Sequence, residues 1–353
     1  MTKFIFTSQD DSWDLALAEA RESLKPAGFS LVRWLCRGVG LGSAEGGFSD
    51  ISKAVRDSSP IFIRHIFPVD YELDFFAAAS GASLGENSNI SPLLTGAAEK
   101  LGRMPSPEKP FSVQVWEVGS SNDFFPMKGS LARQICDYLE TRGFTQDAKN
   151  PVNVISILID NNHIYAGVSA AYDNLSAWPG GMRRFGRGEE RISRAEFKLL
   201  EAAEVFSMDL SSFNNALDLG AAPGGWSRVL AEAGAEVCAV DPAELSEKVS
   251  AYPGIRHYKT TAQEFARKNT RAFDLIVNDM RMDARESAEI MLGAAEMLTE
   301  GGAIVMTLKL PEAKKRAAMD RALAVLEKGY EGLRAKQLFH NRSEVTVAGR
   351  KRR

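Results

Sequence analysis

The sequence predicts an α/β fold in its C-terminal half and smaller α+β units in its N-terminal half. After about residue 177, short apolar runs typical of buried strands alternate with helical patterns. That rhythm indicates a doubly wound parallel sheet covered by helices. Before residue 177, strands and helices mix without a strict βαβ order. The turn-forming segment Trp178-Pro179-Gly180-Gly181 marks a linker between the two patterns.

Length and composition exclude several classes of protein. The 353 residues leave room for two or three domains of roughly 150 residues. A hydrophobic content of 44% and a net charge of −3 are ordinary for a globular protein, so only a local basic patch would indicate nucleic-acid binding. Cys36, Cys136 and Cys238 are far apart, which disfavours a disulfide framework or a zinc site. No apolar run suits a signal peptide or a membrane helix, so we expect a cytoplasmic protein without a metal site.

The N-terminal half divides into two predicted units, residues 1–60 and 61–176. In the first, strands are expected at 4–6 and 29–35 with a helix at 13–24 between them. In the second, strands are expected at 61–67 and 111–116, with helices beginning at Ser91-Pro92 and at about residue 129. The runs 152–158 and 163–168 flank Asp160-Asn161-Asn162 and predict a hairpin.

The third predicted unit spans residues 177–353. Its parallel strands are expected at 216–219, 236–240, 273–278 and 303–308. A last helix at about 312–328 leads into the runs 335–339 and 344–347, which predict a terminal hairpin. The sheet should therefore be mixed at that end.

A glycine-rich turn is the most informative segment of this unit. Residues 217–226 read as strand, turn and helix start, the arrangement in which backbone N–H groups meet a nucleotide-like ligand. The glycines follow the spacing Gly-x-x-x-Gly-Gly, not the Gly-x-Gly-x-x-Gly of dinucleotide sites. An adenosyl ligand without phosphates, S-adenosylmethionine, fits this turn better. The residues predicted to bind it are Gly220, Ala222, Pro223, Gly224, Gly225 and Trp226.

Charged residues follow three of the predicted strands. Ligands of open α/β sheets bind at the carboxyl ends of the strands. Asp241 comes about 20 residues after the glycine turn, where an acidic side chain accepts hydrogen bonds from ribose hydroxyls. Asp279 and Lys309 end the next two strands and should reach the same ligand site.

Two further charged residues do not follow a predicted strand, so the strand-end rule does not select them. Lys198 lies beside the apolar face of a helix that the capping-box pattern Ser193-x-x-Glu196 should open. Glu344 begins a predicted strand. Taken alone, both would be read as surface charges.

These positions together resemble the Lys-Asp-Lys-Glu tetrad of the FtsJ-type ribosomal RNA 2′-O-ribose methyltransferases. Lys198, Asp279 in Asn278-Asp279-Met280, Lys309 in Leu308-Lys309-Leu310-Pro311, and Glu344 in Ser343-Glu344-Val345 match its four members. The chain is most similar to the RlmM type, which methylates a cytidine ribose of large-subunit (23S) ribosomal RNA.

The resemblance covers nearly the whole chain. It implies a ferredoxin-like region at 1–60, a THUMP RNA-binding domain at 61–176 and a Rossmann-like methyltransferase domain at 177–353. It also implies that Asp279 contacts the cofactor. Two positions depart from the family pattern: Thr261 stands where an acidic residue contacts the adenine, and Ala195 stands where a serine lies near the cofactor.

The tetrad has a direct chemical rationale. A ribose 2′-hydroxyl is a poor nucleophile, so the protein must align it with the methyl donor and remove its proton. The resemblance names Lys309 as the general base, whereas the residues alone do not choose between Lys309 and Lys198. Lys198 would supply a neighbouring positive charge, and Asp279 and Glu344 would orient both amines.

Basic residues provide the expected RNA contacts. Five arginines between the linker and the catalytic helix are predicted to track phosphates: Arg183, Arg184, Arg187, Arg191 and Arg194. The tail Arg350-Lys351-Arg352-Arg353 suits either RNA binding or solubility. Trp178 and Tyr165 are candidates for stacking on bases, with core packing the competing role for Tyr165.

Competing functions make different demands on the sequence. A nicotinamide oxidoreductase would carry Gly-x-Gly-x-x-Gly, and an exocyclic-amine methyltransferase would resemble (Asp/Asn)-Pro-Pro-(Tyr/Phe) where this chain reads Asn278-Asp279-Met280-Arg281. Cytosine C5 methylation needs a nucleophilic cysteine, and Cys238 lies within a predicted strand. The remaining alternative is a non-catalytic RNA-binding or ribosome-assembly factor that keeps the fold.

Overall fold

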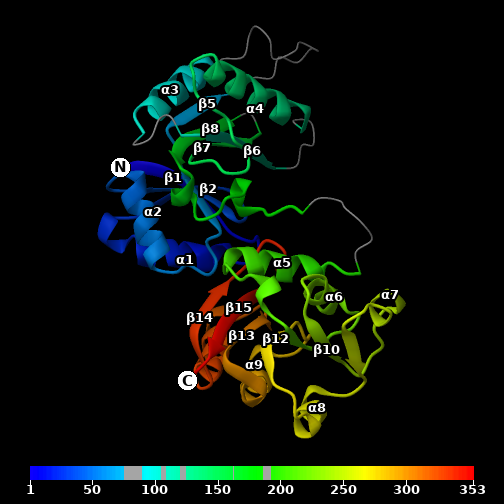
Figure 1. The fold of residues 1–353 in the computed structure, drawn as a ribbon. Coiled ribbons are helices and arrows are strands. Elements are labelled where there is room, and N and C mark those ends of the chain that lie inside the picture. The colour runs from blue at the N-terminus through cyan, green and yellow to red at the C-terminus, as the bar shows by residue number, and fades with distance from the viewer. Residues whose placement is uncertain (75–89, 105–108, 120–124, 162, 186–191) are drawn as a thin grey trace. The chain divides into compact units, whose positions relative to one another are not determined.

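The computed structural model describes residues 1–74, 90–104, 109–119, 125–161, 163–185 and 192–353. It divides into two compact units, Met1–Met182 and Arg183–Arg353, which we describe separately (Figure 1). None of the helices in these described ranges is long and apolar enough to cross a membrane.

The first sheet of the N-terminal unit has four antiparallel strands in the order β2-β3-β1-β4. These are β1 (Thr2–Thr7), β2 (Ser30–Cys36), β3 (Val39–Ala44) and β4 (His65–Pro68), with helices α1 (Trp13–Ser23) and α2 (Phe48–Asp57). Strand β3 was not predicted, because all six of its residues are buried and its sequence does not alternate. Since β4 pairs with β1, this sheet includes residues on both sides of the predicted boundary at residue 60.

The predicted strand at 61–67 is wrong in its first half, since β4 begins only at His65. The carboxylate of Glu19 in α1 accepts hydrogen bonds from the backbone N–H groups of Ile61, Phe62 and Ile63, at 2.8, 2.9 and 3.0 Å. Those three N–H groups are therefore not available for a strand ladder.

The second sheet of this unit has the order β5-β8-β7-β6. Its strands are β5 (Tyr71–Asp74), β6 (Phe111–Val118), β7 (Asn153–Asp160) and β8 (His163–Ala170), and its helices are α3 (Ser91–Gly102) and α4 (Phe125–Glu140). Strands β7 and β8 form the predicted hairpin, whereas β6 pairs with β7 in parallel. Tyr165 is 1% exposed, which confirms the core-packing role for its side chain.

The C-terminal unit has the predicted Rossmann-like α/β fold. Its seven-stranded sheet has the order β11-β10-β9-β12-β13-β15-β14. The strands are β9 (Asn215–Leu219), β10 (Glu236–Val240), β11 (Ile255–Tyr258), β12 (Phe273–Asn278), β13 (Leu298–Lys309), β14 (Tyr330–Lys336) and β15 (Glu344–Lys351). The first five are parallel, and β15 is antiparallel to both β13 and β14, so the sheet is mixed as expected.

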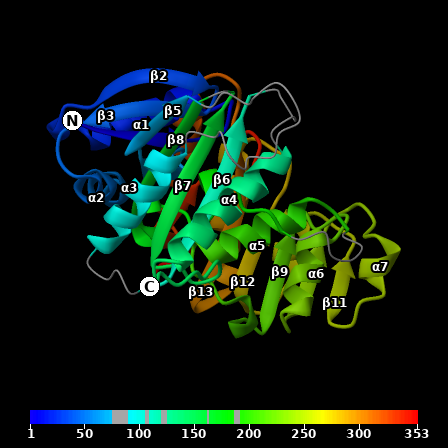
Figure 2. The same cartoon turned by 90° about the horizontal axis from the view of Figure 1, so that it is seen from above.

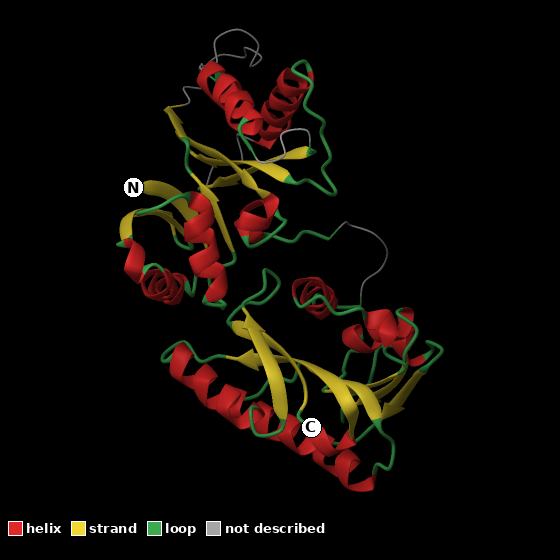
Figure 3. Ribbon diagram, turned by 60° about the vertical axis from the view of Figure 1, so that its left-hand side comes forward, coloured by secondary structure: helices red, strands yellow, loops and turns green. Residues whose placement is uncertain are grey.

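Helices cover both faces of this sheet (Figure 3). They are α5 (Ala195–Val205), α6 (Gly225–Glu232), α7 (Glu247–Ser250), α8 (Ala262–Lys268), α9 (Ala284–Ala294) and α10 (Lys315–Leu326). Figure 2 shows β13, β12 and β9 following one another across the sheet. Buried side chains of α5, α6 and these strands form one apolar cluster, which fixes the helices on the sheet.

Two predicted elements near the end of the chain need correction. Strand β14 occupies 330–336 rather than 335–339. Residues 337–341 instead form a turn in which the Asn341 side chain accepts the N–H of Leu338 at 2.8 Å and the Gln337 amide donates to the carbonyl of Arg342 at 3.1 Å. Helix α10 begins at Lys315 rather than at about 312.

Candidate active site

The carboxyl ends of the parallel strands meet at one edge of the sheet, and four charged residues gather there. Asp279 follows β12 and Lys309 ends β13. The antiparallel register of β13 and β15 places Glu344 directly opposite Lys309. Lys198 approaches from α5. We call these four residues the charge quartet.

Cations and anions alternate within the quartet. Lys309 Nζ lies 2.6 Å from Asp279 Oδ1 and 3.4 Å from Glu344 Oε1. Lys198 Nζ lies 2.6 Å from Glu344 Oε1 and 3.3 Å from both Asp279 oxygens. Each carboxylate therefore contacts both lysines, and neither lysine is buried without a counter-charge.

The two lysines have different surroundings. The side chain of Lys198 is 13% exposed and that of Lys309 is 23% exposed. Burial alone lowers the pKa of Lys198, but Asp279 and Glu344 outweigh burial and raise the pKa above its ordinary value. Burial likewise disfavours charge on Glu344, but Lys198 and Lys309 hold the pKa of this carboxyl below its usual range. Lys198 and Glu344 therefore form a stably charged pair.

A fifth polar side chain, Thr307, joins the quartet and was not predicted. Its hydroxyl donates to Asp279 Oδ1 at 2.6 Å and accepts from Lys309 Nζ at 2.8 Å. Thr307 is fully buried. The only signal in the sequence is its position two residues before Lys309, which puts both side chains on one face of β13.

The loop after β12 holds Asp279 in place. Asn278 is fully buried and its amide donates to Ser287 Oγ of α9 at 3.1 Å, while its Oδ1 accepts the N–H of Met280 at 2.9 Å. The residues on both sides of Asp279 are thus fixed by hydrogen bonds, which restricts its carboxylate to the quartet.

Glu201 ties α5 to the turn before β15. Its side chain is 5% exposed and accepts hydrogen bonds from the backbone N–H groups of Phe339 and His340, at 2.8 and 2.9 Å. His340 Nδ1 also contacts it at 2.8 Å. The His340 ring stacks on Phe197 of α5, with centroids 4.9 Å apart. Lys198 lies on α5, and Glu344 begins the strand that follows the turn. These contacts therefore fix the position of Lys198 relative to Glu344.

The start of α5 differs from the predicted capping box. The helix begins at Ala195, and Ser193 Oγ is buried without a hydrogen bond. Only Glu196 behaves as predicted, accepting the N–H groups of Ile192 and Ser193. Glu196 also pairs with Arg228 of α6, so its carboxylate is shared between the helix start and a neighbouring helix.

The glycine turn leaves room only for backbone. Gly220 and Gly224 have φ values of +75° and +106°, which L side chains rarely adopt. A Cβ atom at Gly220 would lie 2.2 Å from Met280 Cγ, and one at Gly224 would lie 2.6 Å from Val249 Cγ1. A Cβ at Gly225 would lie 2.4 Å from Ser193 Oγ. Side chains of Met280, Val249 and Ser193 therefore pack directly against the backbone of the turn, and only glycine fits at these three positions.

The other predicted cofactor residues have mixed surroundings. Asp241 accepts the N–H of Ala222 at 3.1 Å and of Ala243 at 2.8 Å, so it shapes the glycine turn as well as facing the ligand edge. Trp226 is 3% exposed, and its indole donates to the carbonyl of Ala195 at 2.7 Å. The indole therefore packs the turn against α5. Pro223 lies between these residues, in the turn that leads to α6.

Asp218 is a buried acid that was not assigned a role. It lies in β9, is 1% exposed and accepts the hydroxyl of Ser227 at 2.6 Å. Burial raises its pKa to about 7, and the nearby charges of Asp279 and Asp241 act in the same direction. Among the described residues, no lysine or arginine forms an ion pair with it.

The two positions that depart from the family pattern have structural roles. Thr261 caps α8, with its hydroxyl accepting the N–H of Glu264 at 3.2 Å. Ala195 is the first residue of α5 and uses its carbonyl to hold Trp226. Both bonds stabilise elements at the ligand edge.

The predicted RNA-binding arginines are not equivalent. Arg183 forms a bidentate pair with Glu204, with both N–O distances 2.7 Å, and covers the Phe185 ring at 4.0 Å. Arg184 and Arg194 are exposed. Arg187 and Arg191 lie outside the described residues. In the tail, Arg350 and Lys351 donate to the carbonyls of Gly301 and Leu298, at 2.9 and 2.7 Å.

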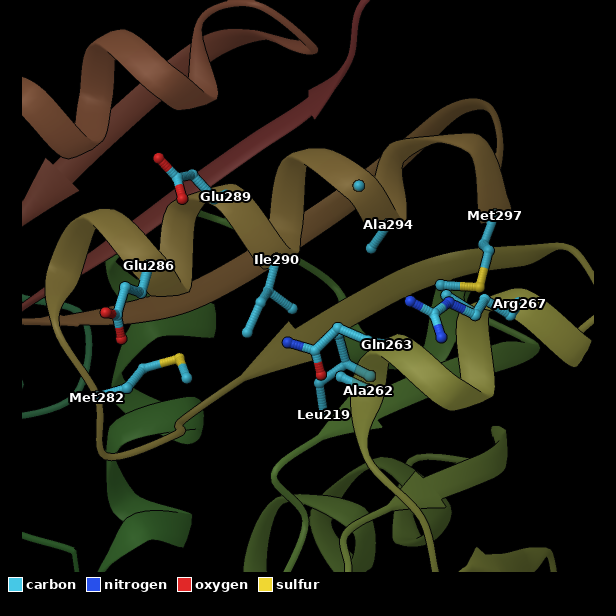
Figure 4. Close-up of a pocket in the computed structure, with 12 residues that line it drawn as sticks. Leu219, Ala262, Gln263, Arg267, Met282, Glu286, Glu289, Ile290, Ala294 and Met297 are labelled. Atoms are coloured by element: carbon cyan, nitrogen blue, oxygen red, sulfur yellow. The ribbon is translucent and has the colours of Figure 1, made fainter.

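A pocket of about 540 Å³ lies between α8 and α9 (Figure 4). Leu219 from the end of β9, Gln263 from α8, and Met282 and Ile290 from the α9 side are among its lining residues. None of the quartet residues lines it. The pocket is therefore separate from the charge quartet and lies among α8, α9 and the end of β9.

Comparison with known proteins shows the family of the chain. Residues 191–339 match the FtsJ-like methyltransferase model. Three curated relatives carry the name Ribosomal RNA large subunit methyltransferase M. The protein of Laribacter hongkongensis is 31% identical, and the match covers 76% of this chain and 79% of the relative. The proteins of Alkalilimnicola ehrlichii and Thauera aminoaromatica are 33% and 30% identical, over 81% and 82% of this chain and 78% of each relative.

Solved structures are more distant. TrmN from Thermus thermophilus is 17% identical with a TM-score of 0.39, and the match covers 100% of both chains. The assignment rests on the sequence relatives and the matching domain. The chain belongs to the family of ribosomal RNA large subunit methyltransferases M and carries its FtsJ-like methyltransferase domain.

Proposed function

We propose that this RNA methyltransferase transfers a methyl group to a ribose 2′-hydroxyl. Family membership makes the chain an RNA methyltransferase with S-adenosylmethionine as methyl donor. Transfer to a ribose hydroxyl is supported mainly by the charge quartet, in which two lysines and two carboxylates contact one another at the carboxyl ends of the strands. A hydroxyl needs this set, because it must be both held and deprotonated.

Lys309 is the proposed general base. It is the more exposed of the two lysines, so a substrate hydroxyl can approach it more readily. Lys198 is more deeply buried, and its raised pKa keeps it charged. Lys198 thus remains the fixed cation, and Lys309 is the lysine that exchanges a proton with the substrate.

Asp279 and Glu344 have positioning roles in this proposal. Asp279 holds Lys309 at 2.6 Å, and Glu344 holds Lys198 at 2.6 Å. When bound, S-adenosylmethionine supplies an electrophilic methyl group on its sulfonium sulfur. The backbone N–H groups of the glycine turn are proposed to meet the donor, and Asp241 to offer carboxylate oxygens to its ribose hydroxyls. The full proposed donor contact set is Gly220, Ala222, Pro223, Gly224, Gly225, Trp226, Asp241 and Asp279.

The substrate is proposed to be a cytidine of 23S ribosomal RNA. The names of the relatives support a large-subunit RNA. Exposed Arg184 and Arg194, which flank the start of the catalytic unit, are the described arginines best suited to meet phosphates. The N-terminal unit, with its two four-stranded sheets, is proposed to hold a ferredoxin-like region and a THUMP RNA-binding region ahead of the catalytic domain. Because β4 pairs with β1, the first region would extend through β4 rather than end at residue 60.

Alkaline hydrolysis tests the reaction type. Ribosomal RNA from cells lacking this gene is incubated with the protein and methyl-labelled S-adenosylmethionine, then hydrolysed with alkali. A 2′-O-methyl group removes the internal nucleophile that alkali needs, so we expect label in alkali-resistant dinucleotides. Label in mononucleotides would mean base methylation and would overturn the proposal. Absence of label with both naked RNA and large-subunit assembly intermediates would favour a non-catalytic assembly factor.

A further inference from the structure

The hydrogen bonds of Thr307 give it a specific place in the charge quartet. Its hydroxyl lies 2.6 Å from Asp279 Oδ1 and 2.8 Å from Lys309 Nζ. An ionised carboxylate only accepts hydrogen bonds, and a hydroxyl has one proton to donate. The Thr307 proton therefore points to Asp279, and Thr307 can only accept from Lys309.

This arrangement constrains the amine of Lys309. Asp279 Oδ1 at 2.6 Å and Thr307 Oγ1 at 2.8 Å both accept from Nζ, and these two oxygens lie only 2.6 Å from each other, so they hold the amine from one side. The contact with Glu344 Oε1 is longer, at 3.4 Å, and Lys198 already contacts that oxygen at 2.6 Å. Asp279 and Thr307 therefore make the closest contacts that the described residues offer the Lys309 amine.

We propose that Thr307 is a positioning residue that holds the Lys309 amine against Asp279. The inference rests on the proposed role of Lys309 as general base. The Thr307 hydroxyl bridges Asp279 Oδ1 and Lys309 Nζ, so it limits where the amine can lie when the substrate hydroxyl arrives. The hydroxyl proton then moves to the lone pair of the neutral Lys309 amine as the new O–CH₃ bond forms and the S–CH₃ bond breaks.

The matched test compares Thr307→Val, Thr307→Ser and Thr346→Val. Valine keeps the shape of threonine but lacks the hydroxyl. Thr346 lies opposite Thr307 in β15 and is equally buried, but its hydroxyl bonds to Asn341 at 3.0 Å. Single-turnover methyl transfer, the KM for RNA and calorimetric binding of S-adenosylhomocysteine are measured for each variant.

We expect Thr307→Val to lower kcat by about 10- to 100-fold, because misdirected catalytic groups cost rate rather than binding. The KM for RNA and the binding of S-adenosylhomocysteine should stay within about twofold of wild type. The rising limb of the pH–rate profile should move to lower pH, since the charged amine loses a charge-assisted acceptor. Thr307→Ser should restore rate and profile, and Thr346→Val should keep wild-type kcat.

Three results would overturn the inference: wild-type kcat in Thr307→Val, failure of Thr307→Ser to restore it, or an equal loss in Thr346→Val. A Lys309→Ala control separates this inference from the proposed function. If Lys309→Ala retains turnover, the proposed base is wrong. If Lys309→Ala is inactive while Thr307→Val is fully active, only the role of Thr307 is wrong.

Discussion

Buried ionisable groups have different surroundings in the two units of the chain. In the N-terminal unit, His65 is fully buried beside the rings of Phe67 and Trp116, and burial lowers its pKa to about 3. It is therefore kept neutral. In the C-terminal unit, the charge quartet keeps four partly buried groups beside opposite charges. Asp218 is buried nearby, and burial raises its pKa to about 7.

The difference shows which groups serve packing and which serve chemistry. A neutral imidazole avoids the large cost of burying a charge, and the His65 ring packs within a cluster of aromatic rings. Paired buried charges rarely add stability, so the four charges of the quartet point to chemistry rather than to packing. Part-buried ion pairs occur in the N-terminal unit as well, such as Lys128 with Glu117 at 2.6 Å, but such a pair joins two groups, whereas the quartet joins four.

The largest expected effect is the loss of methyl transfer in Lys309→Ala. Removing a general base typically costs 10²- to 10⁴-fold, so we expect at least about a 10²-fold loss of rate. Binding of S-adenosylhomocysteine should persist, because the glycine turn is untouched. The exposed Lys328→Ala in the same unit provides the matched control. Retained turnover in Lys309→Ala would show that the charge quartet is not needed for methyl transfer.

The next effect concerns the stability of the catalytic unit. Asp218 has a folded pKa of about 7, above its ordinary value of 3.8, so the native state holds a proton that the unfolded state has lost. Stability due to Asp218 is therefore present below about pH 4 and is lost as pH rises to about 7. We expect a loss of roughly 2 to 3 kcal/mol between about pH 5 and about pH 8. Asp218→Asn should abolish this slope, and exposed Asp320→Asn should not.

The N-terminal unit should show the opposite pH dependence. His65 has a folded pKa of about 3, below its ordinary value of 6.5, so the unfolded state binds a proton first as pH falls. Stability should decrease by roughly 2 kcal/mol between about pH 7 and about pH 5. His65→Phe should remove that decrease. Hydrogen exchange in peptides from β4 and β9 resolves the two units, and parallel pH slopes in both would contradict the comparison.

The smallest expected effect comes from Glu201→Gln. Glutamine offers one acceptor oxygen where Glu201 accepts from two backbone N–H groups and contacts His340. We expect a loss of about 1 to 2 kcal/mol of stability and about a tenfold lower rate, because Lys198 and Glu344 lose a common anchor. Exposed Glu232→Gln serves as the control. A wild-type rate in Glu201→Gln would show that the quartet does not depend on this link.

Much of the catalytic unit could be predicted because parallel strands follow simple rules. The strand-end rule alone selected Asp241, Asp279 and Lys309, and Gly-x-x-x-Gly-Gly selected the turn. Lys198 and Glu344 required the family resemblance, because a helix face and a strand start carry no signal of long-range pairing. Glu344 reaches Lys309 through the register of β13 with β15, and Lys198 reaches Glu344 from α5; local sequence encodes neither contact.

Other features depend on contacts between distant residues. Glu19 accepts hydrogen bonds from the backbone N–H groups of residues 61–63, so β4 begins later than predicted. More than 40 residues separate Glu19 from this segment. The role of Thr307 depends on side-chain rotamers within the quartet. The target nucleotide likewise cannot be derived from the strand pattern, since RNA is recognised by shape and by surface contacts.

The position of β15 between β13 and β14 has a consequence for chain synthesis. Strand β14 precedes β15 in the chain but joins the sheet only through it. As the polypeptide emerges from the ribosome, β14 must wait without a partner until residues 344–351 have been made. Glu344 arrives with that same strand. A nascent chain therefore contains the glycine turn and both lysines before it contains Glu344. Methylation should begin only after β15 has paired with β13 and β14.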